Sequence, residues 1–393
     1  DIAEKYGTPV YVYSKKSMLK RLKTFREAFR ELEHRIFYAV KSNSNISIIR
    51  LFHAEGLGFD VNSYGEMTRA LKAGVLPRDM IMSGVAKSDT DIKEALKAGV
   101  AILKAESKEE VELINHYAGE LRMVQEIALR VNPDIIVPTH PHISTAASGN
   151  KFGIDAEEAL QIYNSAGLYQ NLKFTGIDVH LGSHIFDTVP YVTVVRKLRD
   201  YIESIERGGV FIKHIDLGGG YGVSYTGGDD FPFGELSSEL KNLFPGKERT
   251  IYFEPGRYLT ANAGVLVSKV LFTKRNGPKD IVLIDGSMSE LMRPALYGAY
   301  HEIYNNVVSP GEEMMVYDIA GPVCESSDYL AKERKLYPVK RGDYLSVMST
   351  GSYGYVMASN YNTRPRPYEI LVDGNQYKVI KERETYESLM SGE

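Results

Sequence analysis

The sequence of 393 residues contains one cysteine, Cys324. A single thiol excludes an intrachain disulfide and any metal site built from several cysteines, and it fits a reducing compartment. We therefore expect the protein to be cytoplasmic. A lone cysteine is commonly an inert buried residue, but it can also have a chemical task, so both interpretations of Cys324 stay open.

Long hydrophobic runs and an excess of positive charge are also missing. The sequence has no run of about 18 apolar residues, so we expect no transmembrane helix. Its formal net charge of -4 provides no basic surface for nucleic acid or for a membrane. The residues that follow Asp1 do not resemble a signal peptide. We expect neither nucleic acid nor a membrane as a partner.

Three common catalytic motifs are absent. There is no G-x-S-x-G elbow, no Walker A loop and no H-E-x-x-H helix. The sequence therefore lacks the motifs that a serine hydrolase, a nucleotide hydrolase or a zinc protease of these types requires. A role as an interaction scaffold has no positive signal in the sequence.

Short apolar runs alternate with segments of helical spacing through the first two thirds of the sequence. The expected strands are 36–40, 58–62, 80–84, 101–105, 126–132, 174–181, 214–218 and 250–254. The expected helices between them include 64–73, 89–98, 108–117 and 191–206. The segment ALKAGV occurs twice, and in both copies its glycine is placed to take the left-handed conformation that ends a helix.

Eight strands that alternate with helices predict a closed (β/α)8 TIM barrel, and an open doubly wound sheet is the competing fold. Polar, reactive or glycine residues follow many of the strands, as the active-site face of a barrel requires. These residues are Lys41, Asp60, Asn132, His180, Gly218, Gly219, Gly220, Glu254 and Arg257. We assign the barrel to residues 20–264.

After about Gly264 the sequence shows strand-like segments with few helices between them. These segments are 265–273, 281–285, 313–319, 344–348, 369–372 and 377–380, and the early strand 10–13 is expected to join them. We predict a second, β-rich domain, similar to a β-barrel or sandwich, made of residues 1–19 and 265–393.

Lys41 stands where an apolar run ends, in the segment FYAVKSN at 37–43. A lysine at the end of a strand is usually solvated. A desolvated lysine with a lowered pKa can instead form a Schiff base with an aldehyde. Lys41 alone is a weak signal, and its interpretation depends on the other residues at the strand ends.

Three glycines follow a strand in the segment HIDLGGGYG at 214–222. Glycines let backbone N–H groups converge on a phosphate, although flexible turns of this kind are equally common. The segment is not a dinucleotide-binding fingerprint, because Val223 occupies the position of its last glycine.

A carboxylate and two histidines complete the candidate set. Glu254, in YFEPGR, could hold a pyridine nitrogen protonated, as proteins do when they tune a pyridoxal ring, but a surface salt bridge with Arg257 is equally plausible. In DVHLGSH at 178–184, His180 could stack on such a ring, with Ser183 on its phosphate. His180 and His184 lack the helical spacing of a metal pair. His140 and His142 are more typical of a loop, and no third ligand is implied, so we predict no metal site.

Taken together, the segments resemble the fold-type III pyridoxal-phosphate decarboxylases over nearly the whole chain, and most closely the diaminopimelate decarboxylases. The number, order and spacing of the matching segments make the resemblance specific. The segments are FYAVKSN at 37–43, GFDVNSYGE at 58–66, HISTAASGNKFGI at 142–154, HLGS at 180–183, GGGYG at 218–222, EPGRYLTANAG at 254–264, LMRPALYGAYH at 291–301, GPVCESSDYL at 321–330 and GSYGYVMASNYNTRPRP at 351–367.

The resemblance implies an alanine-racemase-like barrel that binds pyridoxal 5'-phosphate. Lys41 would carry the cofactor, His180 would stack on its ring, and Glu254 would pair with its nitrogen. Ser183 and the hydroxyl group of Tyr353 would bind the phosphate together with the glycines. The implied cofactor-binding residues are Lys41, Asp60, His180, Ser183, Gly219, Gly220, Glu254, Gly256, Arg257 and Tyr353.

The family builds its active site at a dimer interface, so the resemblance implies a homodimer in which the β-rich domain contributes to the interface and the active site. Cys324 would come from the partner chain and would donate a proton to the carbon that loses CO2. Lys41 and Cys324 are therefore the implied catalytic residues. The implied substrate-binding residues are Arg257, Arg293, Tyr297, Glu325 and Tyr353.

Relatives that act on ornithine have Cys followed by Asp where this sequence has Cys324 and Glu325. Glu325 could hold an ammonium group, and Arg257 and Arg293 could hold a carboxylate, so a substrate whose far end is itself an amino acid satisfies both. We expect decarboxylation of meso-2,6-diaminopimelate to L-lysine and CO2, the last step of lysine biosynthesis.

Other functions remain open because the two arginines could instead hold a phosphate or structural carboxylates. The alternatives are a decarboxylase of ornithine, arginine or carboxynorspermidine and, at lower weight, a non-catalytic pyridoxal-phosphate-binding protein. The segments CESSDYL and EPGR argue against an alanine-racemase-like enzyme. The sequence departs from the family at Tyr64, where glycine is more common, and at Asp178, where histidine is more common. We assign no role to either residue.

Overall fold

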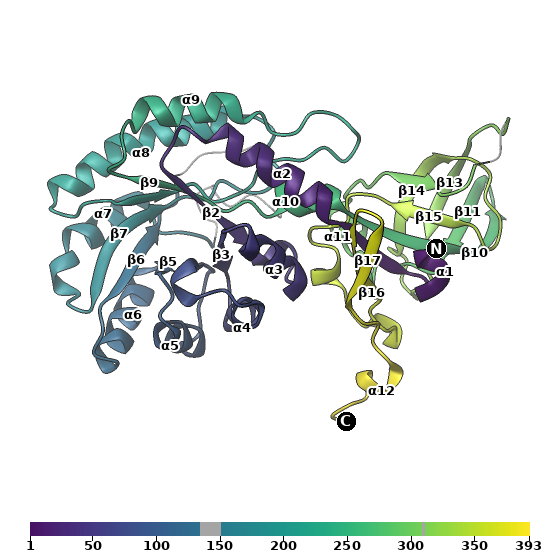
Figure 1. Cartoon of the computed structure of the whole chain (residues 1–393), viewed down its shortest axis with the longest axis horizontal. Coiled ribbons are helices and arrows are strands. Elements are labelled where there is room, and N and C mark those ends of the chain that lie inside the picture. The colour runs from purple at the N-terminus through teal and green to yellow at the C-terminus, as the bar shows by residue number, and fades with distance from the viewer. Residues whose placement is uncertain (134–150, 309–310) are drawn as a thin grey trace. The chain divides into compact units, whose positions relative to one another are not determined.

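The computed structural model describes residues 1–133, 151–308 and 311–393, and it divides into two compact units. The barrel unit consists of Lys23–Val223 and Asp229–Tyr258, and the β-rich unit consists of Asp1–Leu22, Ser224–Gly228 and Leu259–Glu393. Figure 1 shows the alternating strands and helices of the first unit and the many strands of the second. His140, His142 and most of the expected segment 142–154 lie outside the described residues.

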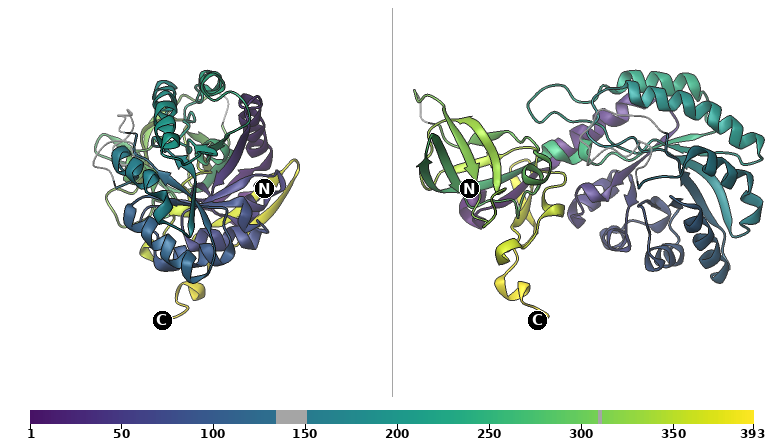
Figure 2. Two further views of the ribbon diagram at one scale, coloured as in Figure 1. Left: turned by 90° about the vertical axis from the view of Figure 1, so that its left-hand side faces the viewer. Right: turned by 180° about the vertical axis from the view of Figure 1, so that it is seen from behind.

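Eight parallel strands close the barrel in sequence order, which confirms the predicted (β/α)8 fold. The left view of Figure 2 shows the helices around these strands. The strands are β2 (His34–Ala39), β3 (Gly58–Val61), β4 (Met80–Met82), β5 (Ile102–Ala105), β6 (Gln125–Arg130), β7 (Leu172–Asp178), β8 (His214–Asp216) and β9 (Thr250–Phe253). The connecting helices are α3 (Ile46–Ala54), α4 (Tyr64–Ala73), α5 (Asp89–Ala98), α6 (Lys108–Glu120), α7 (Ala156–Asn164), α8 (Val189–Arg207) and α9 (Phe233–Leu243).

Local signals set the ends of α4 and α5. Ser63 accepts a hydrogen bond from the N–H of the third residue of α4, and Ser88 does the same for α5. Gly74 and Gly99 end these helices in the left-handed conformation, as the repeated ALKAGV segment predicts.

Alternate residues of a strand face the same side, so the side chains that point into the barrel lie in layers along it. Phe37, Ile81, Ile102 and Ala128, from four different strands, pack together in the apolar layer, and Tyr252 lies against them. Two positions further along their strands, Lys104, Asp216 and Glu254 meet in a polar layer. The polar layer lies at the carboxyl ends of the strands, where a barrel enzyme has its active site.

Seven of the eight predicted barrel strands end earlier than expected, and two of these ends decide where Lys41 and His180 lie. The first ends at Ala39, and Val40–Ser42 forms a 3-10 turn in which the Ser42 hydroxyl donates to the Ala39 carbonyl at 2.8 Å. The sixth ends at Asp178, and the N–H of Val179 instead donates to the carbonyl of Asp216. Lys41 and His180 therefore lie just beyond their strands.

The β-rich unit contains a nine-stranded sheet. Its strands are β1 (Val10–Ser14), β10 (Gly264–Asn276), β11 (Lys279–Ile284), β12 (Ile303–Asn305), β13 (Met315–Ala320), β14 (Tyr329–Leu336), β15 (Tyr344–Val347), β16 (Tyr368–Asp373) and β17 (Gln376–Lys381). The main path of the sheet runs in the order β14-β13-β11-β10-β1-β16-β17, and β15 pairs with β10 and β12. β1 pairs with β10 and β16, so the early strand joins this sheet as predicted.

Sequence reasoning missed β12 and β14. β14 has the sequence YLAKERKL, whose charged residues hide the alternation of a strand, and it lies at the edge of the path with β13 as its partner. Shifts in the register of this pair further weaken the pattern. Among the described residues, no helix has the length and hydrophobicity to cross a membrane.

His214 is a buried histidine in the lower part of the barrel. Its ring stacks on Tyr252 with a centroid distance of 4.8 Å and an angle of 9°. Gly176 makes room for it, because a Cβ atom there would lie 1.9 Å from the Nε2 atom of His214. Burial, followed by the charges of Lys104 and Lys213, lowers the pKa of His214 from 6.5 to about 3.

We predict that this histidine makes the barrel less stable as the pH falls. Below pH 6.5 the unfolded chain binds a proton at His214 that the folded chain excludes until about pH 3, so the free energy of unfolding decreases with falling pH in this window. From about pH 6.5 to pH 5 the loss is about 1.6 kcal/mol. Urea unfolding of the wild type and of His214→Phe, which keeps a flat ring, measures it. The variant should lose less stability over this range, and parallel pH dependences would contradict the prediction.

Candidate active site

Lys41 lies on the 3-10 turn Val40–Ser42 directly after β2. The turn is held from both sides, because the Tyr38 hydroxyl donates to the carbonyl of Asn43 at 2.9 Å and Ser42 donates to Ala39. The backbone beneath Lys41 is therefore buried and fixed, whereas its side chain remains 39% exposed. A reactive group at the rim of a barrel requires this combination of a fixed base and an accessible end.

Asp60, from β3, is the charged neighbour of Lys41. The Nζ atom of Lys41 lies 3.5 Å from the Oδ2 atom of Asp60, whose side chain is fully buried. Burial raises the pKa of Asp60, but the charges of Lys41 and Lys104 outweigh it, and the net pKa falls below 3.8. Asp60 therefore stays ionised beside the amine.

His180 contacts the glycine turn after β8. The N–H of Gly219 donates to the Nδ1 atom of His180 at 3.3 Å, and a Cβ atom on Gly218 would lie 2.3 Å from the same nitrogen. Burial, followed by the positive charges of Arg130 and Lys41, lowers the pKa of His180 well below 6.5. The imidazole is therefore neutral, and a neutral, flat group of this kind can stack on an aromatic ring.

The glycine turn also packs tightly against the end of β9. A Cβ atom on Gly219 would lie 2.3 Å from the carbonyl oxygen of Glu254, and one on Gly220 would lie 2.3 Å from that of Gly182. Gly220 has a φ of 96°, which other residues rarely adopt. Both positions therefore require glycine.

Ser183 and Arg257 meet at the same end of the barrel. The Nη2 atom of Arg257 donates to the Ser183 hydroxyl at 3.0 Å. Gly256, immediately before Arg257, packs on the turn that carries Lys41, since a Cβ atom there would lie 2.9 Å from that of Ser42. The segment after β9 thus connects a guanidinium and hydroxyl pair with the base of Lys41.

Glu254 is buried, and its partner is Lys104, a residue of β5. The Nζ atom of Lys104 contacts the Oε1 atom of Glu254 and lies 2.7 Å from both the Oδ1 atom of Asp178 and the Oδ2 atom of Asp216. One ammonium group thus joins three carboxylates from three strand ends. The alternative of a surface salt bridge between Glu254 and Arg257 is wrong because Glu254 lies inside the barrel.

Asp178, Asp216 and Glu254 are the group of potential metal ligands that the described residues bring together, with oxygen atoms within 4.8 Å of one another. The ammonium of Lys104 contacts all three carboxylates and supplies the positive charge that an ion would otherwise bring. His180 and His184 do not belong to this group.

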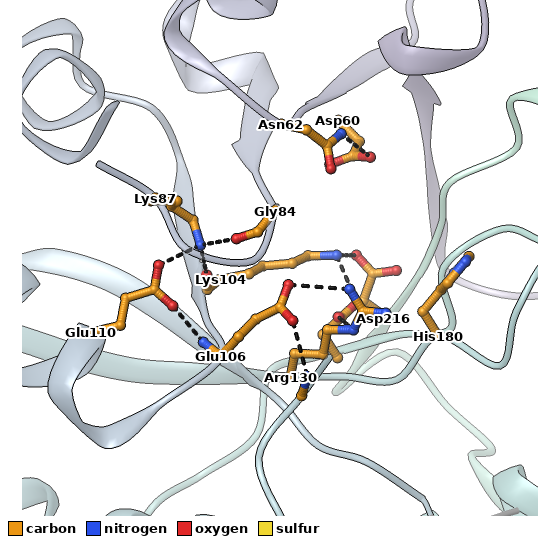
Figure 3. A network of polar contacts seen from close by, with 12 residues as sticks. Asp60, Asn62, Gly84, Lys87, Lys104, Glu106, Glu110, Arg130, His180 and Asp216 are labelled. Carbon is orange, nitrogen blue, oxygen red and sulfur yellow. Dashed lines mark hydrogen bonds and ion pairs between the residues drawn. The ribbon is translucent and has the colours of Figure 1, made fainter. Parts of the chain in front are cut away.

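Further charged residues, among them Lys87, Glu106, Glu110 and Arg130, extend this network (Figure 3). Arg130 donates to the Oε1 atom of Glu106 at 3.1 Å and lies 3.9 Å from the Oδ2 atom of Asp178. Lys87, whose side chain is 1% exposed, donates to the carbonyl of Lys104 and, at 2.8 Å, to Glu110. The polar layer is therefore connected through ion pairs over several strands.

The remaining candidates lie in the β-rich unit. Arg293 begins α11 (Arg293–Tyr297), is buried, and donates to the Tyr225 hydroxyl at 3.1 Å. It also lies 3.0 Å from the Nε2 atom of His301, whose Nδ1 atom lies 2.8 Å from the carbonyl of Met348. Since Nδ1 donates to that carbonyl, Nε2 accepts from Arg293, and the guanidinium is held in place. Tyr297 is the last residue of α11 and is half-buried.

Cys324 and Glu325 are exposed in the loop between β13 and β14, so the interpretation of Cys324 as an inert buried residue is wrong. Asp328 fixes this loop: its carboxylate accepts from the N–H of Val323 at 2.8 Å and from that of Met288 at 2.6 Å. The N–H of Cys324 donates to the Asn362 side chain at 2.9 Å. The loop therefore holds its shape while it presents a thiol and a carboxylate to solvent.

Tyr353 lies in a crowded turn after β15. Its φ is 54°, in the left-handed region, which is strained for a residue with a side chain. Ser352 beside it is fully buried, and its hydroxyl lies 2.5 Å from that of Thr260. The surrounding contacts therefore hold Tyr353 in a conformation that it would not adopt by itself.

Comparison with known proteins assigns the family. Residues 15–261 match the family model described as pyridoxal-dependent decarboxylase, pyridoxal binding domain. Over 393 residues the chain is 42% identical to the diaminopimelate decarboxylase of Vibrio cholerae, an alignment that covers 99% of this chain and 93% of the relative. The chain belongs to the diaminopimelate decarboxylase family.

Other members of the family support this assignment. The diaminopimelate decarboxylase of Neisseria meningitidis serogroup A is also 42% identical, over all of this chain and 96% of the relative. The crystal structure of the Helicobacter pylori enzyme complexed with L-lysine is similar with a TM-score of 0.94 at 36% identity, and it covers 99% of this chain and 97% of that chain. A co-complex of the M. jannaschii enzyme with L-lysine has a TM-score of 0.93 at 35% identity, covering 99% and 93%.

The residues of the barrel fit pyridoxal phosphate, the cofactor of the decarboxylase family. An aldehyde needs a primary amine, and Lys41 offers one beside an ionised carboxylate. A pyridine ring fits a neutral imidazole on its face and a carboxylate at its nitrogen, and His180 and Glu254 are available. A phosphate fits the hydroxyl and guanidinium groups of Ser183 and Arg257. This donor set has the chemistry that each part of the cofactor requires.

Sequence reasoning missed the residues that surround Glu254. It gave no role to Lys104, Glu106 or Arg130, and it left Asp178 without one. A signal for Lys104 was present, because Ile102 packs inside the barrel and the residue two positions later faces the same way. A lysine inside a barrel requires carboxylates nearby, and the ends of β7 and β8 supply them.

We predict that Gly219→Ala destabilises the turn behind Glu254, because the new Cβ atom would lie 2.3 Å from a backbone carbonyl that cannot move freely. The expected loss in the free energy of unfolding is about 1–3 kcal/mol, with weaker binding of pyridoxal phosphate. Gly234→Ala is the matched control, since nothing lies within 4 Å of a Cβ atom at that position in α9. Urea unfolding and cofactor titration measure both effects, and equal behaviour of the two variants would contradict the prediction.

Proposed function

We propose that the protein decarboxylates meso-2,6-diaminopimelate to L-lysine and CO2 with pyridoxal phosphate as its cofactor, the last step of lysine biosynthesis. The observation that carries the proposal is the presence, at one end of the barrel, of the Lys41 amine beside ionised Asp60, together with neutral His180 and buried Glu254. The relatives named diaminopimelate decarboxylase, which align with 99% of the chain or more, support the choice of substrate.

In this proposal Lys41 holds the cofactor covalently, His180 covers its ring and Glu254 faces its nitrogen. Its phosphate is bound by Ser183, Gly219, Gly220, Gly256 and the Tyr353 hydroxyl, and Asp60 and Arg257 complete the cofactor-binding residues. When bound, pyridoxal phosphate supplies an electron sink for the electron pair that remains on the α-carbon when CO2 leaves.

The residues of the chain then have three tasks. Glu254, as a carboxylate, keeps a proton on the ring nitrogen by attraction between opposite charges. Asp60 keeps the amine of Lys41 in place at the rim. Cys324, whose thiol is exposed, donates a proton to the α-carbon after CO2 has left.

The far end of the substrate carries an ammonium and a carboxylate. We assign the ammonium to Glu325 and the carboxylate to Arg257 and Arg293, with Tyr297 and Tyr353 as further contacts. The support for Arg293 is its fixed position, because His301 and Tyr225 hold the guanidinium before any substrate arrives. A fixed guanidinium loses little conformational freedom when it binds a carboxylate.

We further propose a homodimer in which the β-rich unit contributes to the interface and to the active site. Cys324 and Glu325 would then complete the site of the other subunit. The support is that both are exposed on a loop that Asp328 holds in shape. The single thiol supports the cytoplasm as the location.

The function is tested by substrate turnover. The protein, reconstituted with pyridoxal phosphate, should release CO2 and L-lysine from meso-2,6-diaminopimelate and should act far less on ornithine, arginine and carboxynorspermidine. Lys41→Ala should abolish turnover and the visible absorption of the protein-linked cofactor, because the variant lacks the amine that holds the cofactor in this proposal. Detection of lysine by chromatography and an absorption spectrum measure both.

Lys108→Ala, at an exposed lysine of α6, is the matched control and should behave as the wild type. Faster turnover of another substrate would contradict the choice of diaminopimelate. Retention of the absorption band in Lys41→Ala would contradict the covalent role of Lys41.

The shared active site is tested by mixing subunits. If Cys324 acts in the site of the partner, a hybrid dimer of Lys41→Ala and Cys324→Ala subunits contains one site with both native residues. Random exchange of equal amounts should then restore about a quarter of the wild-type activity, although each variant alone is nearly inactive. The absence of any recovery, after exchange has been shown with tagged subunits, would place both residues in one chain.

A further inference from the structure

Lys104 crosses the interior of the barrel and ends among three carboxylates. Its side chain is 2% exposed, and its strand, β5, is buried along its whole length. The ammonium contacts Glu254 and lies 2.7 Å from oxygen atoms of Asp178 and Asp216. Figure 3 shows the extended side chain directed at Asp216. These carboxylates come from the ends of β7, β8 and β9, so one residue links three strand ends.

Lys104 reduces the net negative charge of this cluster. Three buried carboxylates with one ammonium already carry an excess of negative charge, which Arg130 reduces from the far side of Asp178. Removing the ammonium would leave the carboxylates to repel one another in a medium of low dielectric constant. The easiest response is for one of them to take up a proton.

Its environment favours protonation of Glu254. Burial, followed by the charges of Asp216 and Asp60, raises the pKa of Glu254 well above 4.5, and Lys104 acts in the opposite direction. Burial raises the pKa of Asp216 to about 6, again against the effect of Lys104. For Lys104 itself, burial lowers the pKa, but the three carboxylates outweigh it and hold the pKa well above 10.5. The lysine therefore stays charged at all physiological pH values.

We infer that Lys104 is a positioning residue for Glu254: its ammonium, held by Asp178 and Asp216, fixes the Glu254 carboxylate and opposes its protonation where it faces the cofactor. The inference rests on the proposed function, in which Glu254 faces the ring nitrogen. An ionised Glu254 keeps the proton on that nitrogen, whereas a neutral carboxylic acid would donate its own proton in a hydrogen bond and leave the ring uncharged. Lys104 thus determines how well the ring accepts electrons, without touching the substrate.

The inference predicts a specific failure in Lys104→Met, which keeps the length of the side chain and removes its charge. At neutral pH the ring nitrogen should lose its proton in a large share of the molecules, and kcat should fall about tenfold or more with little change in KM, since a shift of one pKa unit changes the ionised fraction of Glu254 about tenfold. The active and the inactive form both hold one proton between Glu254 and the ring nitrogen, so their ratio does not depend on pH and kcat should not recover as the pH rises.

Two measurements on the holoenzyme test this. The first is the nitrogen chemical shift of pyridoxal phosphate labelled with 15N in its ring, which reports the protonation of that atom without turnover. The second is the kcat–pH profile with meso-2,6-diaminopimelate. The ionisable groups that face Lys104 and Glu254 are Asp60, Asp178, Asp216, Arg130, Lys41, His180, His214 and Tyr221.

The double variant Lys104→Met/Asp178→Asn serves in case the single variant folds poorly. It removes one positive and one negative charge together, so the protonated nitrogen and part of the activity should return. Lys87→Met is the matched control because it also removes a buried lysine, one paired with Glu110 outside the carboxylate cluster. It should lower stability and leave the nitrogen shift and kcat unchanged, whereas a purely structural role of Lys104 would make the two single variants alike.

An unchanged nitrogen shift and an unchanged kcat in Lys104→Met would overturn the inference. A double variant that is no better than the single one would also overturn it. Failure of the proposed function gives a different result, because a wild type without turnover of diaminopimelate still allows the nitrogen shift of the bound cofactor to be compared between wild type and Lys104→Met.

Discussion

Charge that is buried inside the barrel must be compensated there, and the upper layer of the barrel follows from this requirement. Moving a carboxylate out of water costs several kcal/mol unless partners replace the lost solvation. Asp178, Asp216 and Glu254 share the ammonium of Lys104, and Arg130 adds its charge behind Asp178. Because each partner is on a different strand, the strand ends are held at distances that suit the ion pairs. The same ion pairs therefore determine both the charge of the site and the spacing of the strand ends.

Much of the fold was readable from the sequence because its signals are local. The helices 64–73 and 89–98 begin after a capping serine and end at a left-handed glycine, so their bounds follow from a few neighbouring residues. The order of barrel strands follows from the alternation of apolar runs and helices. Lys41 and Glu254 also stood out locally, because each breaks the apolar pattern at a strand end.

The parts that the sequence did not reveal depend on pairs of residues far apart in the chain. Lys104 and Glu254 are 150 positions apart, and the residues around each of them in the sequence do not indicate that the two are in contact. Asp328 lies in a recognisable segment, yet its task of holding the loop around Cys324 depends on Met288, 40 positions away. The edge strand β14 takes its regularity from β13, since its own charged sequence lacks the alternation of a strand. Such features can be recognised only once the folded structure shows which distant residues are in contact.

The backbone of Tyr353 carries a cost that limits how this protein can change. A tyrosine with a φ of 54° stores on the order of 1 kcal/mol of strain, which asparagine or glycine would relieve. The turn cannot relax around it, because a Cβ atom on Gly351 would lie 1.9 Å from the carbonyl of Thr260 and one on Gly354 would lie 2.5 Å from that of Thr350. Selection for thermal stability alone would replace the tyrosine, whereas selection for its phenol group would retain it. If its hydroxyl group has the proposed role in cofactor binding, the strained residue marks a position where stability and function oppose each other, and a stabilised version of the enzyme is best sought by substitutions elsewhere.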